Sequence, residues 1–276
     1  MKRFAGLLSL LVLTSAAWAE TWSFGMSPFR SPSLTAQYWN PILDYVEKAS
    51  GVKLELVTTR TGQEASDEGA RGKFDFIWDN HIFEPTHAAA GYKVLVRPAG
   101  DPIHGQIIVA ENSPLKTLRD VQGQEMGVSS KAAFVGYAVT MGELYRQGIA
   151  VKPVVAGTME GVMGQVRAGE IPVGSVNSKV LSGYAAREGF KYRTLWLSGP
   201  YLDVPIAVHP RVPQAVAKAV RDALTGMAKD PEGLKILKAT AELIKAGAPY
   251  GFVPETDANY ENQREVYRVI WKKEGR

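Results

Sequence analysis

Two serines and a lysine near the middle of the chain form the strongest candidate for a ligand-binding site. Ser129, Ser130 and Lys131 end a strand-like segment over residues 125–129 and precede a periodic apolar segment that predicts a helix over residues 132–147. At such a turn, free backbone N–H groups and the positive end of the helix dipole attract an anion, and Lys131 adds a cation. The alternative is that a serine hydroxyl only caps the helix.

Polar turns of the same kind follow other strand-like segments, at Thr61, at Asp79 and Asn80, and before Thr158. Ligands of α/β proteins collect at the carboxyl ends of strands, so several such ends from two halves of the chain would form a cleft. Arg60 would add a second cation to that cleft. Asp79 would accept a hydrogen bond from an amine or a protonated oxyanion, or would pair with a lysine.

Sequence patterns typical of enzymes are missing. The chain has no Cys, no G-x-S-x-G elbow and no phosphate-binding G-x-x-x-x-G-K-[ST] loop. Its four histidines, His81, His87, His104 and His209, form no metal-binding pattern such as H-E-x-x-H. We therefore expect no catalytic residue, no metal and no cofactor. The alternative, an exported enzyme, would depend on Asp79 acting with His104.

The first nineteen residues have the layout of a cleaved secretory signal. Lys2 and Arg3 precede an apolar run over residues 4–14, and Ala17 and Ala19 form an A-x-A cleavage site. The run is shorter than the roughly 20 residues of a membrane-spanning helix, although an uncleaved anchor is the alternative. We expect cleavage after Ala19 and a mature protein that is soluble outside the cytoplasmic membrane; the family resemblance given below implies the periplasm. Cleavage leaves 30 basic and 28 acidic side chains, a net charge of +2 that does not indicate nucleic-acid binding.

Short strand-like segments alternate with longer amphipathic segments, which is typical of α/β units. In the first half we expect a helix capped by Ser33, together with strands over residues 21–26, 52–57, 74–78 and 92–97 and helices over 61–71 and 83–90. In the second half we expect strands over 107–110, 125–129, 151–156, 173–176, 192–197 and 204–208, and helices over 115–120, 132–147, 159–168 and 179–187. Helices over 216–227, 233–246 and 257–273 complete the chain.

Seven short segments, in order, resemble the periplasmic solute-binding proteins of phosphonate, phosphate and phosphite ABC importers. They are SFGM (23–26), WNPILDY (39–45), KFDFIW (73–78), SPLKTLRDVQG (113–123), the serine pair at 129–130, DVPI (203–206) and DPEG (230–233). The segment at 113–123 is the most distinctive. The resemblance covers nearly the whole chain after the leader.

The resemblance implies a two-lobe, type II periplasmic-binding-protein fold of the α/β class. Each lobe would hold a mixed, mostly parallel sheet flanked by helices. Residues 20–102 and 207–276 would form the first lobe, and residues 103–206 would form the second lobe with two hinge crossings. A small ligand would bind between the lobes, and the closed form would dock on an inner-membrane permease without chemical change to the ligand. The alternative is that the closed form signals to a membrane sensor kinase.

The ligand pocket of that family is largely replaced in this sequence. Lys131 interrupts the usual Ser/Thr cluster, Arg60 stands where an aromatic residue is common, and Asn177 replaces an acid. The two cations favour a small anion, such as a phosphorus oxyanion. The candidate binding residues are Arg60, Thr61, Asp79, Asn80, His104, Ser129, Ser130, Lys131, Thr158, Asn177, Tyr201 and Asp203.

Overall fold

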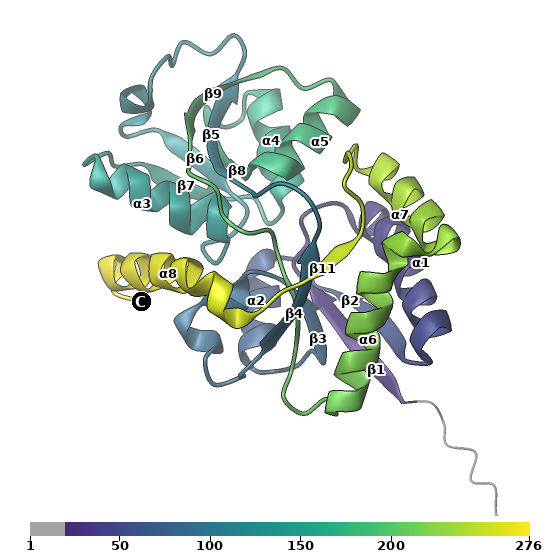
Figure 1. Ribbon diagram of the computed structural model, residues 1–276. Helices are drawn as coiled ribbons and strands as arrows, with labels where there is room; N and C mark the ends of the chain where they lie inside the picture. Colours follow the sequence, from purple (N-terminus) through teal and green to yellow (C-terminus); the bar gives the residue numbers. More distant parts are fainter. Residues whose placement is uncertain (1–19) are drawn as a thin grey trace, which may run out of the picture.

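The computed structural model describes residues 20–276, so the predicted leader over residues 1–19 lies outside the described residues. The chain forms two lobes, each built on one sheet (Figure 1). The sheet of lobe 1 has the spatial order β11 (Phe252–Pro254), β4 (Lys93–Pro98), β10 (Ile206–Val208), β3 (Phe76–Trp78), β1 (Thr21–Met26) and β2 (Lys53–Thr58). The sheet of lobe 2 has the order β7 (Lys152–Val155), β6 (Glu125–Val128), β8 (Val173–Asn177), β5 (Gly105–Ala110) and β9 (Tyr192–Leu197).

Both sheets mix parallel and antiparallel strands, which confirms the predicted fold class. In lobe 1, β1 runs parallel to β2 and β3, and β10 runs antiparallel to β3 and β4. In lobe 2, β6 runs parallel to β7 and β8, and β5 runs antiparallel to β8 and β9. The chain crosses from β4 to β5 and returns from β9 to β10. The crossings are joined by two backbone hydrogen bonds between Ile103 and Tyr201, of 2.8 and 2.9 Å, and so form a two-stranded hinge.

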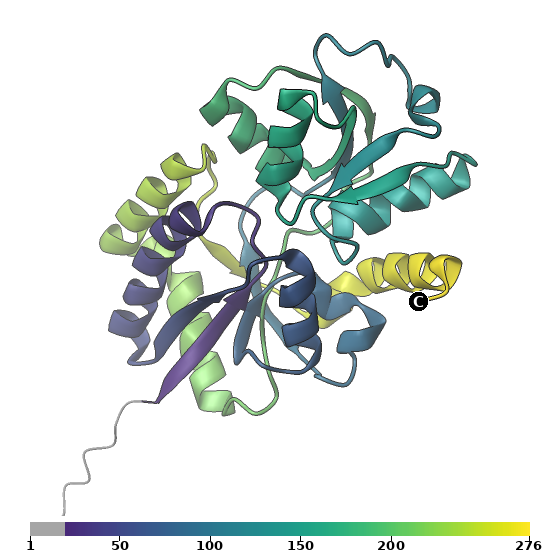
Figure 2. The ribbon, with the colours of Figure 1, turned by 180° about the vertical axis from the view of Figure 1, so that it is seen from behind.

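The helices of lobe 1 lie on both faces of its sheet. One face carries α1 (Pro32–Ser50), α6 (Gln214–Gly226) and α7 (Pro231–Leu243), and the other carries α2 (Gly62–Ala70) with the 3₁₀ turns η1 (His81–Phe83) and η2 (Pro85–His87) (Figures 1 and 2).

The cap of α1 is Ser31, whose Oγ accepts from the N–H of Leu34 at 3.3 Å. The predicted Ser33 cap is wrong because Pro32 already occupies the first helical position, where its missing N–H costs nothing. The predicted helix over 83–90 is also wrong, since Pro85 divides it into short turns.

An aromatic cluster holds the carboxyl ends of β1 and β3 in place. The ring of Trp39, from α1, lies 4.9 Å from the ring of Phe24 and 5.0 Å from that of Trp78, measured between centroids. All three side chains are buried. The loops that leave β1 and β3 therefore begin from a rigid base at the edge of the sheet that faces lobe 2.

The helices of lobe 2 likewise cover both faces of its sheet. On one face lie α4 (Met159–Ala168) and α5 (Ser178–Glu188); on the other, the π-helical turn η4 (Phe134–Ala138) leads into α3 (Val139–Arg146), and η3 (Leu118–Val121) follows β5. The predicted helix start at residue 132 is wrong, and so is the alternative in which a serine hydroxyl caps that helix. The helical segment begins at Phe134, after Ala133, and no side chain caps it.

The C-terminal helix contacts both lobes. After the short turns η5 (Met227–Lys229) and η6 (Asp257–Tyr260), α8 (Glu261–Glu274) packs against η1 and η2 of lobe 1 and against η4 and α3 of lobe 2 (Figures 1 and 2). The Tyr267 hydroxyl donates to the Ala132 carbonyl at 2.7 Å, and Glu274 accepts from the hydroxyls of Tyr137 and Tyr145 at 2.6 and 2.9 Å. This helix therefore bridges the lobes beside the loop that carries the serine pair.

We expect Tyr267→Phe to lower the free energy of unfolding by about 1 kcal/mol, because the buried Ala132 carbonyl loses its side-chain donor. Chemical denaturation measures the change. Tyr192→Phe is the control, since the Tyr192 hydroxyl makes no hydrogen bond within residues 20–276. Equal stability of the two variants would contradict the role given to Tyr267.

Candidate ligand-binding site between the two lobes

The two lobes touch at several points, so the structure is in a closed arrangement. The N–H of Glu160, in α4, donates to the Phe29 carbonyl at 3.3 Å, and the N–H of Gly62, in α2, donates to the Gly157 carbonyl at 3.4 Å. A third contact joins α5 to the end of α7. A Cβ atom added to Gly183 would lie only 2.3 Å from the carbonyl oxygen of Ile244.

A cavity of about 400 Å³ lies between the lobes, next to the hinge. Its walls come from the loop after β1, from α1, from the end of β3, from the start of α5, from the return crossing and from the segment between α7 and β11. The side chains used below are Phe29, Arg30, Tyr38, Trp78, Asn177, Lys179, Asp203, Leu237, Ala241, Ile244 and Lys245. The volume and the mixed lining are typical of small-molecule sites.

Arg30 differs from the other cations that line this cavity because it has no ion-pair partner among the described residues. It lies in the loop after β1 and is half-buried. No carboxylate within residues 20–276 forms an ion pair with its guanidinium within 4.0 Å, whereas the other cavity cations are paired. Lys179 Nζ lies 2.6 Å from Asp203 Oδ2, and Lys245 pairs with Glu242. The cavity thus presents one cation whose charge is not balanced by a direct contact.

Burial affects the titration of Arg30 and of its neighbour Tyr38. Desolvation lowers the pKa of Arg30, while the nearby Tyr38 and Glu160 oppose that change, and the guanidinium stays charged. Desolvation also raises the pKa of Tyr38, which keeps its hydroxyl neutral and able to donate. Glu160 does not neutralise Arg30, since its own partner is Arg187 at 2.6 Å. An anion that enters the cavity would accept a charge-assisted hydrogen bond from the Arg30 guanidinium, which donates to no carboxylate among the described residues.

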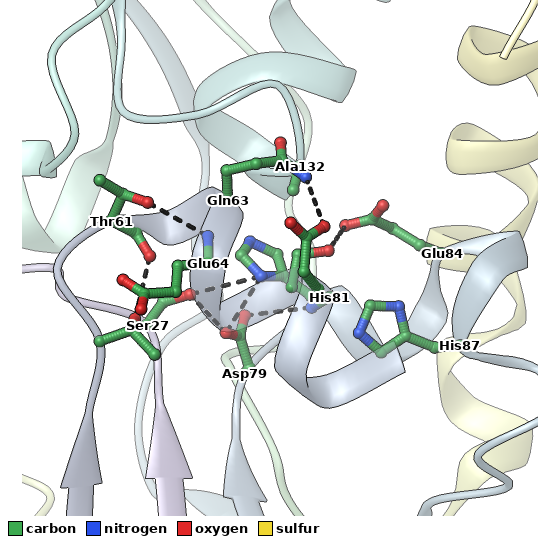
Figure 3. Close-up of polar contacts among 12 residues, drawn as sticks. Ser27, Thr61, Gln63, Glu64, Asp79, His81, Glu84, His87 and Ala132 are labelled. Atoms are coloured by element: carbon green, nitrogen blue, oxygen red, sulfur yellow. Dashed lines mark hydrogen bonds and ion pairs between the residues drawn. The ribbon is translucent and has the colours of Figure 1, made fainter. Parts of the chain in front are cut away.

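A second group of polar side chains lies buried where the strands of lobe 1 end (Figure 3). The Ser27 hydroxyl donates to Asp79 Oδ2 at 2.5 Å, and His81 Nδ1 lies 3.2 Å from the same oxygen. Burial lowers the pKa of His81, although Asp79 opposes this, and burial raises the pKa of Glu84 well above its usual range. Both effects favour the uncharged forms of these side chains.

Ser27, Asp79 and His81 are the residue types of a hydrolase triad, but they do not have its geometry. In a triad, histidine stands between the serine and the acid and uses a different ring nitrogen for each. Here the Ser27 hydroxyl donates directly to Asp79, and the same His81 nitrogen faces both partners, at 3.3 and 3.2 Å. The enzyme alternative depended on Asp79 acting with His104. Among residues 20–276 these two side chains share no hydrogen bond, and His104 Nδ1 instead bonds the Ser198 carbonyl at 2.8 Å.

The predicted binding residues fall into separate places. Asn177 and Asp203 line the cavity, and Asn177 also accepts from the N–H of Lys179 at 2.9 Å. Asp79, Asn80 and Ser130 are buried near the contact between the lobes, where the Oδ1 of Asn80 and the Oγ of Ser130 have no hydrogen-bond partner among the described residues. Ser130 and His81 are close to Gly62: a Cβ atom added there would lie 3.1 Å from Ser130 Oγ and 4.0 Å from the ring of His81.

The remaining predicted residues have structural roles or are exposed. Thr61 and Thr158 cap helices, accepting from the N–H groups of Glu64 at 3.1 Å and Gly161 at 2.9 Å. Tyr201 packs its ring against Phe134, and Ser129 is buried at the end of β6. The side chain of Arg60 is 92% exposed beside Glu64, and Lys131 is exposed. Neither of these two cations lines the cavity.

The predicted binding residues do not include Arg30 and Tyr38, which line the cavity. One sequence signal points to Arg30, which lies four residues after the end of the predicted strand over residues 21–26. Arg60 and Lys131 lie closer to predicted helix starts. Within residues 20–276 no group of His, Asp and Glu is arranged to hold a metal, and no helix is long and apolar enough to cross a membrane.

Comparison with known proteins gives a consistent result. Residues 24–260 match the family described as ABC transporter, phosphonate, periplasmic substrate-binding protein. The fold is similar to that of a binding-protein component of an ABC phosphonate transporter from Pseudomonas aeruginosa, with a TM-score of 0.79, 14% identity and coverage of 92% of this chain and 87% of that one. It is also similar to PhnD1 from Prochlorococcus marinus in complex with methylphosphonate, with a TM-score of 0.75, 13% identity and coverage of 91% and 98%.

Proposed function

The chain belongs to the family of periplasmic substrate-binding proteins of ABC phosphonate transporters, and from this premise we propose that it captures a small anion in the cavity between its lobes. The single observation that supports the anion is Arg30, a cavity cation with no carboxylate partner within 4.0 Å among the described residues. The neutral Tyr38 hydroxyl beside it would supply a second donor. PhnD1 from Prochlorococcus marinus, which has a similar fold, was solved in complex with methylphosphonate, an anion of the charge that such a site needs.

Closure would couple binding to delivery. Arg30 and Tyr38 belong to lobe 1, Asn177 and Lys179 belong to lobe 2, and all four line one cavity in this structure. Separation of the lobes would take the two sets apart. A ligand that contacts both sets therefore shifts the equilibrium toward closure. The family works with an ABC permease, and we propose that the closed form docks on one. A permease gene and an ATPase gene beside this one would support transport, whereas a kinase gene alone would support sensing.

Export follows from the leader. We propose that residues 1–19 are removed after Ala19, so that the mature protein begins at Glu20 in the periplasm. The intact mass of the protein recovered from a periplasmic extract measures this directly. A mass that still includes residues 1–19 would instead indicate an uncleaved anchor.

A thermal-shift screen of the mature protein tests anion capture. The panel holds phosphate, phosphite, alkylphosphonates, sulfate, alkylsulfonates, carboxylates and amines without an acid group. We expect one or more of the anions to raise the melting temperature, since a ligand at 100 times its Kd stabilises the folded state by about 2.7 kcal/mol. Stabilisation by amines alone would contradict the proposal.

A further inference from the structure

The cavity is much larger than an anionic headgroup. Its volume of about 400 Å³ would hold about a dozen water molecules, at ~30 Å³ each. A phosphonate or sulfonate headgroup on Arg30 would occupy only a small part of that space. The rest would stay filled with water, or would be filled by another part of the ligand.

The wall on the lobe 1 side is aromatic. Phe29, Tyr38 and Trp78 all line the cavity, and the rings of Phe29 and Trp78 meet edge to face with centroids 5.0 Å apart. The Trp78 Nε1–H already donates to the Val204 carbonyl at 3.1 Å. Trp78 therefore has no free polar group to offer a ligand, and its ring adds to an apolar surface beside the Arg30 headgroup position.

A second wall, from α7 and the turn after it, is aliphatic. Leu237, Ala241 and Ile244 contribute to the same cavity. Figure 1 shows α7 beside α5 of the other lobe, where the Ile244 carbonyl meets Gly183. Because α7 packs against α1 of lobe 1, the aliphatic wall belongs to the same lobe as the aromatic wall, and α5 of lobe 2 meets its end. Water confined between aromatic and aliphatic walls is released favourably when an apolar group replaces it.

We infer that the ligand is an organic anion, with one acidic headgroup on Arg30 and an apolar substituent of several carbons against the walls formed by Phe29, Trp78 and α7. The inference rests on the proposed function, anion capture in this cavity. Arg30, the Tyr38 hydroxyl and Asn177 provide polar partners for a headgroup, whereas Phe29, Trp78, Leu237, Ala241 and Ile244 offer an oxyanion no side-chain partner that is free to bind it. The headgroup and the substituent are therefore recognised by separate parts of the cavity.

A homologous series of ligands tests this inference by titration calorimetry. The probes are methyl-, propyl-, pentyl- and phenylphosphonate, with the matching sulfonates as a second headgroup. Each buried methylene tightens binding by about fourfold, so two buried methylenes already exceed about tenfold. We expect pentyl- and phenylphosphonate, or the matching sulfonates, to bind at least that much more tightly than the methyl compound.

The outcomes separate the inference from the proposed function. Tight binding of the methyl compound or of phosphate, with no gain along the series, would overturn the inference and leave anion capture intact. No binding by any anion would overturn both. Ala241→Leu narrows the space beside the aliphatic wall and should reduce the gain in affinity along the series from methyl- to pentylphosphonate. Ala239→Leu is the control, because Ala239 is exposed on the same helix and does not line the cavity.

Discussion

Arg30→Gln weakens binding of the anionic ligand by about tenfold to a hundredfold. A hydrogen bond to a charged group contributes about 1.5–3 kcal/mol, and each 1.4 kcal/mol is a factor of ten in Kd. The Gln side chain keeps an N–H donor but lacks the positive charge of the Arg30 guanidinium, which has no ion-pair partner in the cavity. Titration calorimetry with the best anion of the panel measures the change.

The matched controls for Arg30→Gln are Arg60→Gln and Lys131→Ala. Both positions are exposed cations that do not line the cavity, so their Kd values should stay within about twofold of the wild type, as for surface charges in general. Arg30→Gln should leave the melting temperature of the ligand-free protein unchanged or higher, because within the described part of the chain the arginine has no carboxylate partner to lose. A large loss of affinity in Lys131→Ala, with none in Arg30→Gln, would place the anion at the serine pair instead.

Gly183→Ala is expected to weaken binding by about fivefold to a hundredfold without destabilising the open protein. The added Cβ atom would lie 2.3 Å from the Ile244 carbonyl oxygen, a backbone atom that cannot swing away as a side chain would. Steric conflicts of this kind cost about 1–3 kcal/mol, and here the cost falls only on the closed form. Within α5 itself alanine is favoured over glycine by about 1 kcal/mol, so the lobe does not lose stability.

Gly164→Ala is the control for this closure contact. Gly164 lies in α4 of the same lobe, and a Cβ atom there would meet only the Tyr184 hydroxyl, at 3.8 Å. Its affinity should equal that of the wild type. If Gly183→Ala also binds normally, the ligand-bound form does not bring α5 onto the end of α7.

The fold was predictable because its signals are local and repeated along the chain. Strand-like and amphipathic segments alternate from Thr21 onward, and the segment at 113–123 points to one family. Errors arose where a single residue overrode a periodic pattern. Pro32 moved the cap of α1 to Ser31, and Pro85 divided a predicted helix into turns.

The binding site was harder to predict because it depends on contacts between distant segments. Arg60 and Lys131 had the right charge at predicted helix starts, yet their side chains face solvent. Arg30 follows a predicted strand, but the proposal for it rests on its lack of a carboxylate partner among residues 20–276, and the sequence does not reveal that lack. The bridging position of α8, placed with the first lobe by chain order, also depends on such contacts.

A crystal structure of the mature protein with the tightest anion of the panel tests the central claim most directly. We predict that the headgroup lies within hydrogen-bond distance of the Arg30 guanidinium, between lobes closed through Gly183 and Ile244. A headgroup bound at Ser129, Ser130 and Lys131, with Arg30 not in contact, would contradict the account.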